Sequence, residues 1–326
     1  MGNRLGPATA TALAVLLAAG CTWSDPDPAP APTPTATAPT APASGSAPLR
    51  SEHVTVHPER TVWWGGRSFA LQDLVVSEQT GDRLGYELVL RIDTASPVEL
   101  AVPFPRIVLE SEGRVVADSR ADSTTPQRYE PGSGTVHTML WGSAPAGEPV
   151  DPDGLALVLT DSVPGSARAV LPVGDRGPEQ VALAPVPLRP SAATLDTGRF
   201  HWGVVSAQLR DDTTGSTAVL RDNDVTVNHH SRVLRGLKQG QHTVQVLFDA
   251  PAGTIGDLLG WQLTLPDGRQ VAPSVPVTLT TYPDRTDRVS LAAWFDFYGD
   301  TAGTYTLRAA DGQRPDDPAV LTLVAG

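Results

Sequence analysis

The sequence predicts an all-β fold, with two tandem β-sandwich domains in the part of the chain after residue 50. Apolar and polar residues alternate there with a period of two, and similar segments recur in the same order in both halves. The longest run with helical spacing, residues 255–259, is little more than a turn. The 326 residues also exceed one typical domain of about 100 to 200 residues, so two domains are expected.

The first twenty residues predict a secretory signal peptide. Arg4 and the terminal amine supply positive charge, and residues 8–19 form an apolar run. This run is shorter than the roughly 20 apolar residues that a membrane-spanning helix needs. It ends in Leu17-Ala18-Ala19-Gly20-Cys21, which resembles the lipobox of bacterial lipoproteins, where small residues precede the cleavage site. We therefore expect residues 1–20 to be a lipoprotein signal peptide.

Cys21 is the candidate lipidation site. It is the only cysteine, so no intramolecular disulfide can form. The lipobox resemblance implies a diacylglycerol with palmitate-type acyl chains on its sulfur, and two chains give stable membrane attachment. The expected location is the extracellular face of the cell membrane, and the membrane is the first predicted partner.

Residues 21–50 predict a disordered linker after the anchor. From Ser24 to residue 49 the sequence is rich in Pro, Ala and Thr and lacks the large apolar side chains that could form a core. Proline favours extended segments of ~3.1 Å per residue. We expect this stretch to hold the folded part several nanometres from the membrane.

Alternating segments predict the strands, and their recurrence predicts a duplication. Residues 86–93 and 242–249 both alternate apolar and polar side chains. Three further matches follow in order: 107–117 with 262–272, 129–141 with 282–294, and 169–171 with 319–321. The first of these predicts hairpins that turn at Glu112-Gly113 and at Asp267-Gly268.

The matched segments set the expected domain boundaries. We predict β-sandwich domain 1 over residues 51–175, a linker over 176–195 and β-sandwich domain 2 over 196–326. Copies of about 120 to 130 residues fit a sandwich of immunoglobulin-like size. Tyr305, in Asp-Thr-Ala-Gly-Thr-Tyr, is expected in a tyrosine corner, and the matching residues Trp141 and Trp294 are expected in the cores.

The first copy is similar to the immunoglobulin-like extracellular domains of unknown function found on lipoproteins of Gram-positive, actinobacterial-type bacteria. The resemblance covers about residues 60–173. Its pattern consists of a Gly-containing strand (66–76), an alternating strand (86–93), a hairpin with an acidic-Gly turn, and Pro131-Gly132 before a further strand. The second copy has Pro283-Asp284 instead. The resemblance implies a surface location and a binding or scaffolding role, without shared catalytic residues.

The charge of the chain argues against nucleic acid as a partner. The 24 basic and 36 acidic residues give a net charge of −12, which repels a phosphate backbone. The expected partner is instead an envelope protein or a glycan.

The chain offers no complete catalytic or metal-binding motif. Asp196-Thr197-Gly198 matches the aspartic-protease triplet, but no second triplet could share its proton, and a turn into the strand 199–205 explains it better. His229-His230 would point to opposite faces of a strand. Asp222 and Asp224 are spaced as in a calcium loop, without its later Gly and Glu. We predict no catalytic residues, no metal and no cofactor.

Trp63 and Trp64 are the candidate binding residues, because tryptophans are enriched at interfaces. Strand alternation favours a second interpretation, in which one ring faces the core and the other lies under a loop.

These observations predict a non-enzymatic cell-envelope lipoprotein whose two β-sandwich domains bind a protein or a glycan. One alternative is a carrier that holds a small apolar or lipidic ligand between the sheets or domains. A second alternative is a secreted hydrolase with an unfamiliar site, which predicts a deep pocket with converging polar residues.

Overall fold

The computed structural model describes the strands and many of their connections. The described residues are 51–78, 83–94, 105–119, 134–143, 151–161, 163–197, 201–216, 220–222, 225–227, 233–252, 259–277, 279–281, 287–311 and 314–325. Strands dominate these ranges, a 3₁₀ turn η2 lies at Pro152–Gly154, and α-helix is absent from them. The predicted all-β class is therefore confirmed. Within the described part, the chain has no helix with the length and apolarity needed to span a membrane.

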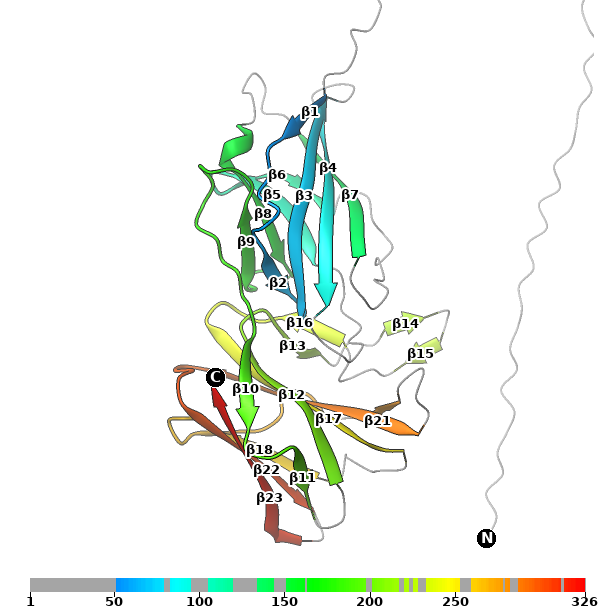
Figure 1. Cartoon of the computed structure of the whole chain (residues 1–326), viewed down its shortest axis with the longest axis vertical. Helices are drawn as coiled ribbons and strands as arrows, with labels where there is room; N and C mark the ends of the chain where they lie inside the picture. Colours follow the sequence, from blue (N-terminus) through cyan, green and yellow to red (C-terminus); the bar gives the residue numbers. More distant parts are fainter. Residues whose placement is uncertain are drawn as a thin grey trace, which may run out of the picture. The chain divides into compact units, whose positions relative to one another are not determined.

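Nine described strands form the first sheet (Figure 1). They are β1 (Ser51–Val54), β2 (Val62–Trp64), β3 (Arg67–Glu78), β4 (Arg83–Thr94), β5 (Arg106–Ser111), β6 (Arg114–Asp118), β7 (Gly134–Ser143), β8 (Leu155–Thr160) and β9 (Arg168–Pro172). The order is β1-β3-β4-β7-β6-β5-β8-β9, with β2 on β3. A single residue pair, Asp118 with Trp141, joins β6 to β7. The sheet therefore divides there into two layers that share one core.

The alternation of apolar and polar side chains along β4 explains how this strand contributes to the core of the first sandwich. Tyr86, Leu88, Leu90 and Ile92 are all buried in it, as the period of two predicts. The same cluster contains Leu109 of the opposite layer.

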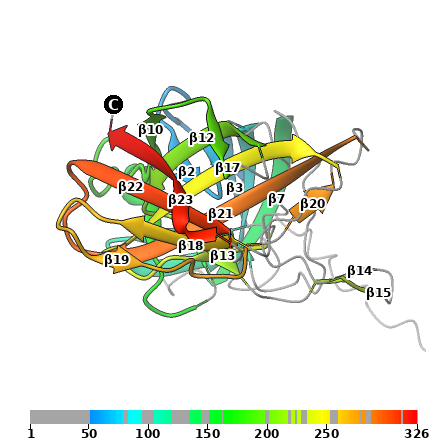
Figure 2. The ribbon, with the colours of Figure 1, turned by 90° about the horizontal axis from the view of Figure 1, so that it is seen from below.

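Ten further strands form the second sheet (Figure 2). They are β10 (Val186–Pro190), β11 (Thr194–Asp196), β12 (His201–Arg210), β17 (Gln241–Pro251), β18 (Leu259–Thr264), β19 (Gln270–Val271), β20 (Leu279–Thr281), β21 (Arg288–Tyr298), β22 (Thr304–Asp311) and β23 (Arg314–Ala325). Their order is β19-β18-β22-β23-β10-β12-β17-β21-β20, with β11 on β12. Trp202, Phe248, Phe295 and Tyr305 fill the space between its layers.

Two runs of strands have the same internal order in both sheets. In the first, the runs are β3-β4-β7 and β6-β5-β8-β9; in the second, they are β12-β17-β21 and β19-β18-β22-β23. The runs are joined through β7 and β6 in the first sheet, and through β23, β10 and β12 in the second. The hairpin turn at Glu112-Gly113 is confirmed, since Ser111 pairs with Arg114 and both turn residues have positive φ, 48° and 76°.

The expectation that both matched tryptophans are core residues is confirmed for Trp294 and wrong for Trp141. Trp141 is only half-buried. Trp294 is fully buried, but on the face of β21 opposite Phe295, in a separate cluster with Leu247 and Val275. A two-stranded ribbon of β13 (Thr213–Ser216) and β16 (Val233–Gly236) covers this face, because Gly215 of β13 lies against the Trp294 ring. A second ribbon pairs β14 (Leu220–Asp222) with β15 (Val225–Val227).

Part of the segment predicted as the linker is integral to the second sheet. Strand β10 lies between β12 and β23, where Leu188 pairs with Ala325. Both sheets belong to one unit that runs from Pro48 to Gly326. The second sheet thus begins ten residues before the predicted boundary at residue 196.

Candidate binding groove

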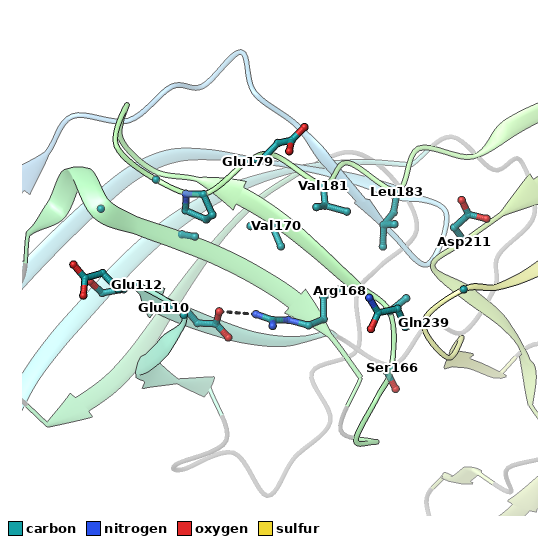
Figure 3. Close-up of a pocket in the computed structure, with 18 of the residues that line it drawn as sticks. Glu110, Glu112, Ser166, Arg168, Val170, Glu179, Val181, Leu183, Asp211 and Gln239 are labelled. Atoms are coloured by element: carbon teal, nitrogen blue, oxygen red, sulfur yellow. Dashed lines mark hydrogen bonds and ion pairs between the residues drawn. The ribbon is translucent and has the colours of Figure 1, made fainter.

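The floor of a groove is the outer face of the first sheet at β8 and β9. Leu157, Ala169 and Leu171 face the core, so alternation turns Arg168 and Val170 outward. Glu110 of β5 and the hairpin turn after it extend this floor (Figure 3).

The segment after β9 forms one wall. The backbones of Val170 and Val181 exchange two hydrogen bonds, each 2.9 Å long, so this segment runs along β9. Trp63 donates its backbone N–H to the carbonyl of Ala182 at 2.7 Å. Leu183 packs against the first core with φ of +50°, a left-handed conformation that is uncommon for a bulky residue. Such backbone strain persists where surrounding contacts impose it, and it is found at functional sites.

The second sandwich closes the groove at one end. Asp211 and the turn from Gln239 to His242 line it there. Two backbone hydrogen bonds hold that turn to the first sandwich: Ala167 N–H donates to Leu237 at 2.6 Å, and Gln239 N–H donates to Gly165 at 3.1 Å. The groove has a volume of about 1080 Å³ and is partly open to solvent.

Among the charged side chains of the described lining, acidic ones outnumber basic ones. The lining holds five carboxylates, from Glu110, Glu112, Asp151, Glu179 and Asp211, against the guanidinium groups of Arg168 and Arg176. The resulting field favours cationic ligands.

Both guanidinium groups are already paired. Arg168 contacts Glu110 at 2.5 Å, and Arg176 contacts Asp151 at 2.9 Å. His242 Nδ1 lies 2.6 Å from Asp211. Within the described part of the chain, Glu112 and Glu179 have no ion-pair partner.

A buried ion pair joins the two sandwiches next to the groove. Arg210 and Asp212 are each 1% exposed and form a bidentate pair, with Nε–Oδ1 at 2.9 Å and Nη2–Oδ2 at 2.7 Å. Asp212 Oδ2 also accepts the backbone N–H of Gly65 at 2.7 Å. The Arg210 guanidinium packs over Gly66, where a Cβ would lie 3.1 Å from Nη1. We call this ion pair, together with its hydrogen bond to Gly65, the Arg210–Asp212 joint. It fixes the backbone on both sides of Asp211.

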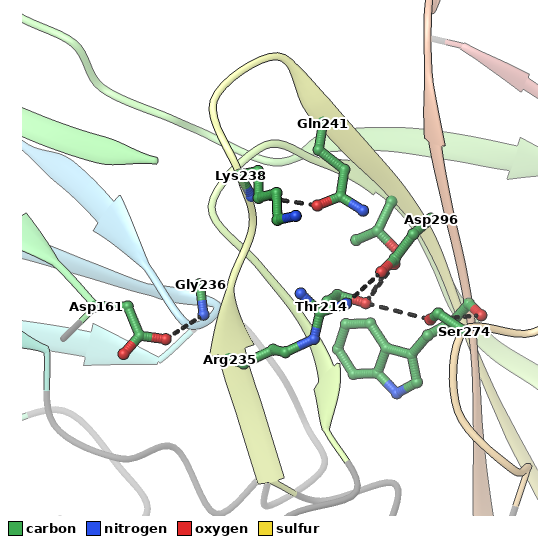
Figure 4. A network of polar contacts seen from close by, with 10 residues as sticks. Asp161, Thr214, Arg235, Gly236, Lys238, Gln241, Ser274 and Asp296 are labelled. Atoms are coloured by element: carbon green, nitrogen blue, oxygen red, sulfur yellow. Dashed lines mark hydrogen bonds and ion pairs between the residues drawn. The ribbon is translucent and has the colours of Figure 1, made fainter. Parts of the chain in front are cut away.

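A second polar network holds the β13–β16 ribbon in place (Figure 4). Gly236 N–H donates to Asp161 of the first sandwich at 2.6 Å. Asp296 of β21 accepts the Thr214 hydroxyl at 2.5 Å and pairs with Arg235 at 2.9 Å. The ribbon is therefore fastened both to the sheet beneath it and to the neighbouring sandwich.

The structure separates the two candidate tryptophans. Trp64 is 3% exposed and belongs to the first core, so its ring is not at the surface. Trp63 is half-buried, and its backbone is bound to the segment that forms the groove wall. The arrangement agrees with the second interpretation of this pair, and neither residue lines the groove.

The remaining candidate residues are not brought together. Asp196 ends β11 and contacts His201, the first residue of β12, at 3.0 Å. Cys21, His229 and His230 lie outside the described residues. Among the residues that are described, no three His, Cys, Asp or Glu side chains are grouped so that they could hold a metal ion.

No family model matches this chain, and a search of curated proteins finds no match either. Apart from the Glu112-Gly113 turn, the groove residues carry no signal in the sequence that marks them as a site. They come from segments of both halves, and no local pattern identifies them as neighbours.

Proposed function

We propose that the protein is a non-enzymatic, lipid-anchored envelope protein that presents two joined β-sandwiches to an envelope protein or a glycan. The observation that carries this proposal is the groove, which takes its lining from both sandwiches and the segment between them. A site built in this way requires the two sandwiches to act together, and the buried Arg210–Asp212 joint supports that.

The shape of the groove favours binding of a partner at the protein surface over transport of a lipid. A carrier encloses most of an apolar ligand in a largely apolar cavity. Here the groove is only partly enclosed, and its lining includes seven charged side chains from Glu, Asp and Arg. The space between the layers of each sandwich is occupied by core side chains, among them Leu88 and Phe248.

The proposal of a lipid anchor rests on the sequence around Cys21. The lipobox-like segment precedes it, and the Pro-, Ala- and Thr-rich tether follows. This order suits a protein held at the outer face of the membrane with its groove accessible.

Replacement of the anchor tests the location. Cys21→Ala removes the sulfur that would carry the lipid, so the protein should move from the membrane fraction to the medium. Ser24→Ala, three residues further on, should leave it in the membrane fraction. Cell fractionation with immunoblotting measures both, and membrane retention of Cys21→Ala would contradict the proposal.

A further inference from the structure

We propose that the groove binds a cationic polypeptide segment, so that the partner is a protein that offers Lys or Arg side chains. This inference rests on the proposed function, because it names the chemistry of the partner at that site. Charge and the composition of the lining support it.

Charge complementarity with the groove favours a cationic ligand. The arginines of the lining are neutralised by Glu110 and by Asp151, whereas Glu112 and Glu179 remain available. Glu112 lies on the hairpin turn and Glu179 on the wall segment, so they belong to different elements that border the groove (Figure 3). A segment with basic side chains would therefore meet a carboxylate from each.

The lining favours polypeptide over glycan. Among the described residues that line the groove there is no Trp, Tyr or Phe, the side chains whose flat faces pack against sugar rings. Val170, Val181 and Leu183 supply aliphatic contacts instead. Aliphatic side chains and the methylene stems of Lys and Arg can pack on such a surface while their charged ends reach the carboxylates.

The binding test uses a fluorescein-labelled peptide of alternating Lys and Val and the full-length protein in nonionic detergent. Fluorescence anisotropy should show binding that weakens as salt rises, because it depends on charge. The double substitution E112Q/E179Q should weaken binding roughly fivefold, since each exposed pair contributes a fraction of a kcal/mol to about 1 kcal/mol.

The matched control is D316N/D317N. Asp316 and Asp317 are exposed carboxylates on β23, outside the groove lining, and their replacement changes the net charge by the same amount. This variant should bind the peptide within about twofold of the original protein. Equal weakening by both double variants, or no weakening by E112Q/E179Q, would overturn the inference.

Two further outcomes are decisive. Direct binding of a fluorescein-labelled, neutral N-acetylglucosamine oligomer, with no binding of the Lys peptide, would identify a glycan site and overturn the inference. Absence of peptide binding together with release of Cys21→Ala from the membrane would overturn this inference alone and leave the anchored location in place.

Discussion

Arg210 and Asp212 carry the only described ion pair in which both side chains are almost wholly buried. Burial of charge is costly unless each charge is matched and hydrogen-bonded. Here Asp212 has the guanidinium, the Gly65 N–H and the Thr213 N–H as donors, at 2.7 to 2.9 Å. The pair therefore holds the sandwiches together because all of its strong polar groups meet partners.

Removal of Asp212 tests this account. Asp212→Ala leaves the Arg210 charge buried without its carboxylate, which should lower the free energy of unfolding by about 3–5 kcal/mol. Asp93→Ala breaks the exposed Arg91–Asp93 contact, and the loss should stay below about 1 kcal/mol. Urea unfolding curves measure both, and a small loss for Asp212→Ala would contradict the structural role of the joint.

Ionisation of Tyr305 should lower the free energy of unfolding at alkaline pH. Its hydroxyl donates to the Thr301 carbonyl at 2.7 Å, the backward bond expected of a tyrosine corner. Burial, with smaller contributions from the charges of Asp300 and Asp211, raises the pKa of Tyr305 to about 12 from 10.0. The raised pKa means that the folded state favours the protonated phenol, so this contribution is complete below pH 10 and is lost as pH rises to about 12.

Tyr305→Phe checks the assignment. Because the variant lacks the hydrogen bond to Thr301, its free energy of unfolding at neutral pH should be about 1 kcal/mol lower. The variant should also show a smaller decline in the free energy of unfolding between pH 10 and about pH 12. Tyr298→Phe, at a ring that is 50% exposed, is the control and should behave like the original protein. An unchanged alkaline decline in Tyr305→Phe would contradict the burial of its phenol.

At the scale of elements, the β13–β16 ribbon depends on close approach to the sheet beneath it. A Cβ on Gly215 would lie 2.8 Å from Trp294 Cδ1 and 2.8 Å from Val275 Cγ2. These distances are too short for a real contact, so a larger residue must displace the ribbon or the ring.

Gly215→Ala should therefore destabilise the protein by about 1–3 kcal/mol and shift Trp294 emission to longer wavelength as its ring meets water. Gly134→Ala is the matched control on strand β7, because nothing lies within 4 Å of the added Cβ. Its stability should change by less than about 1 kcal/mol. Similar losses in the two variants would show that the ribbon does not lie against Trp294.

The sequence predicts strands well where one face is buried and predicts poorly what covers the other face. Tyr86 to Ile92 alternate because one layer of core side chains receives them. Trp294 follows the same alternation, yet its side is covered by a ribbon from a distant segment. Period-two patterns identify the two faces of a strand but do not state which neighbour covers each face.

The predicted linker contains β10, whose prolines weaken the strand signal in the sequence. Pro187 and Pro190 lack the backbone N–H that a strand uses for pairing, and such residues are typical of connections. In the structure, β10 still pairs with β12 and with β23 through short stretches of two and three residues. Long-range partners thus override the local preference.

At the scale of the whole molecule, the segment between the sandwiches acts as part of both. Val181 is bound to β9 of the first sandwich, and β10 continues into the second sheet. Together with the Arg210–Asp212 joint, this makes the groove a property of the pair of sandwiches. No local motif could predict it, because its lining residues lie up to 132 positions apart, from Glu110 to His242.

The most direct test of the account is site-specific photo-crosslinking in intact cells that carry the native envelope. A benzoylphenylalanine is placed at Val181 in the groove or at Val320 on β23, two valines that are 41% and 55% exposed. If a partner binds in the groove, position 181 should give a discrete higher-mass adduct and position 320 none. No adduct at position 181, or equal adducts from both positions, would contradict the claim that the joined sandwiches present this groove to a partner.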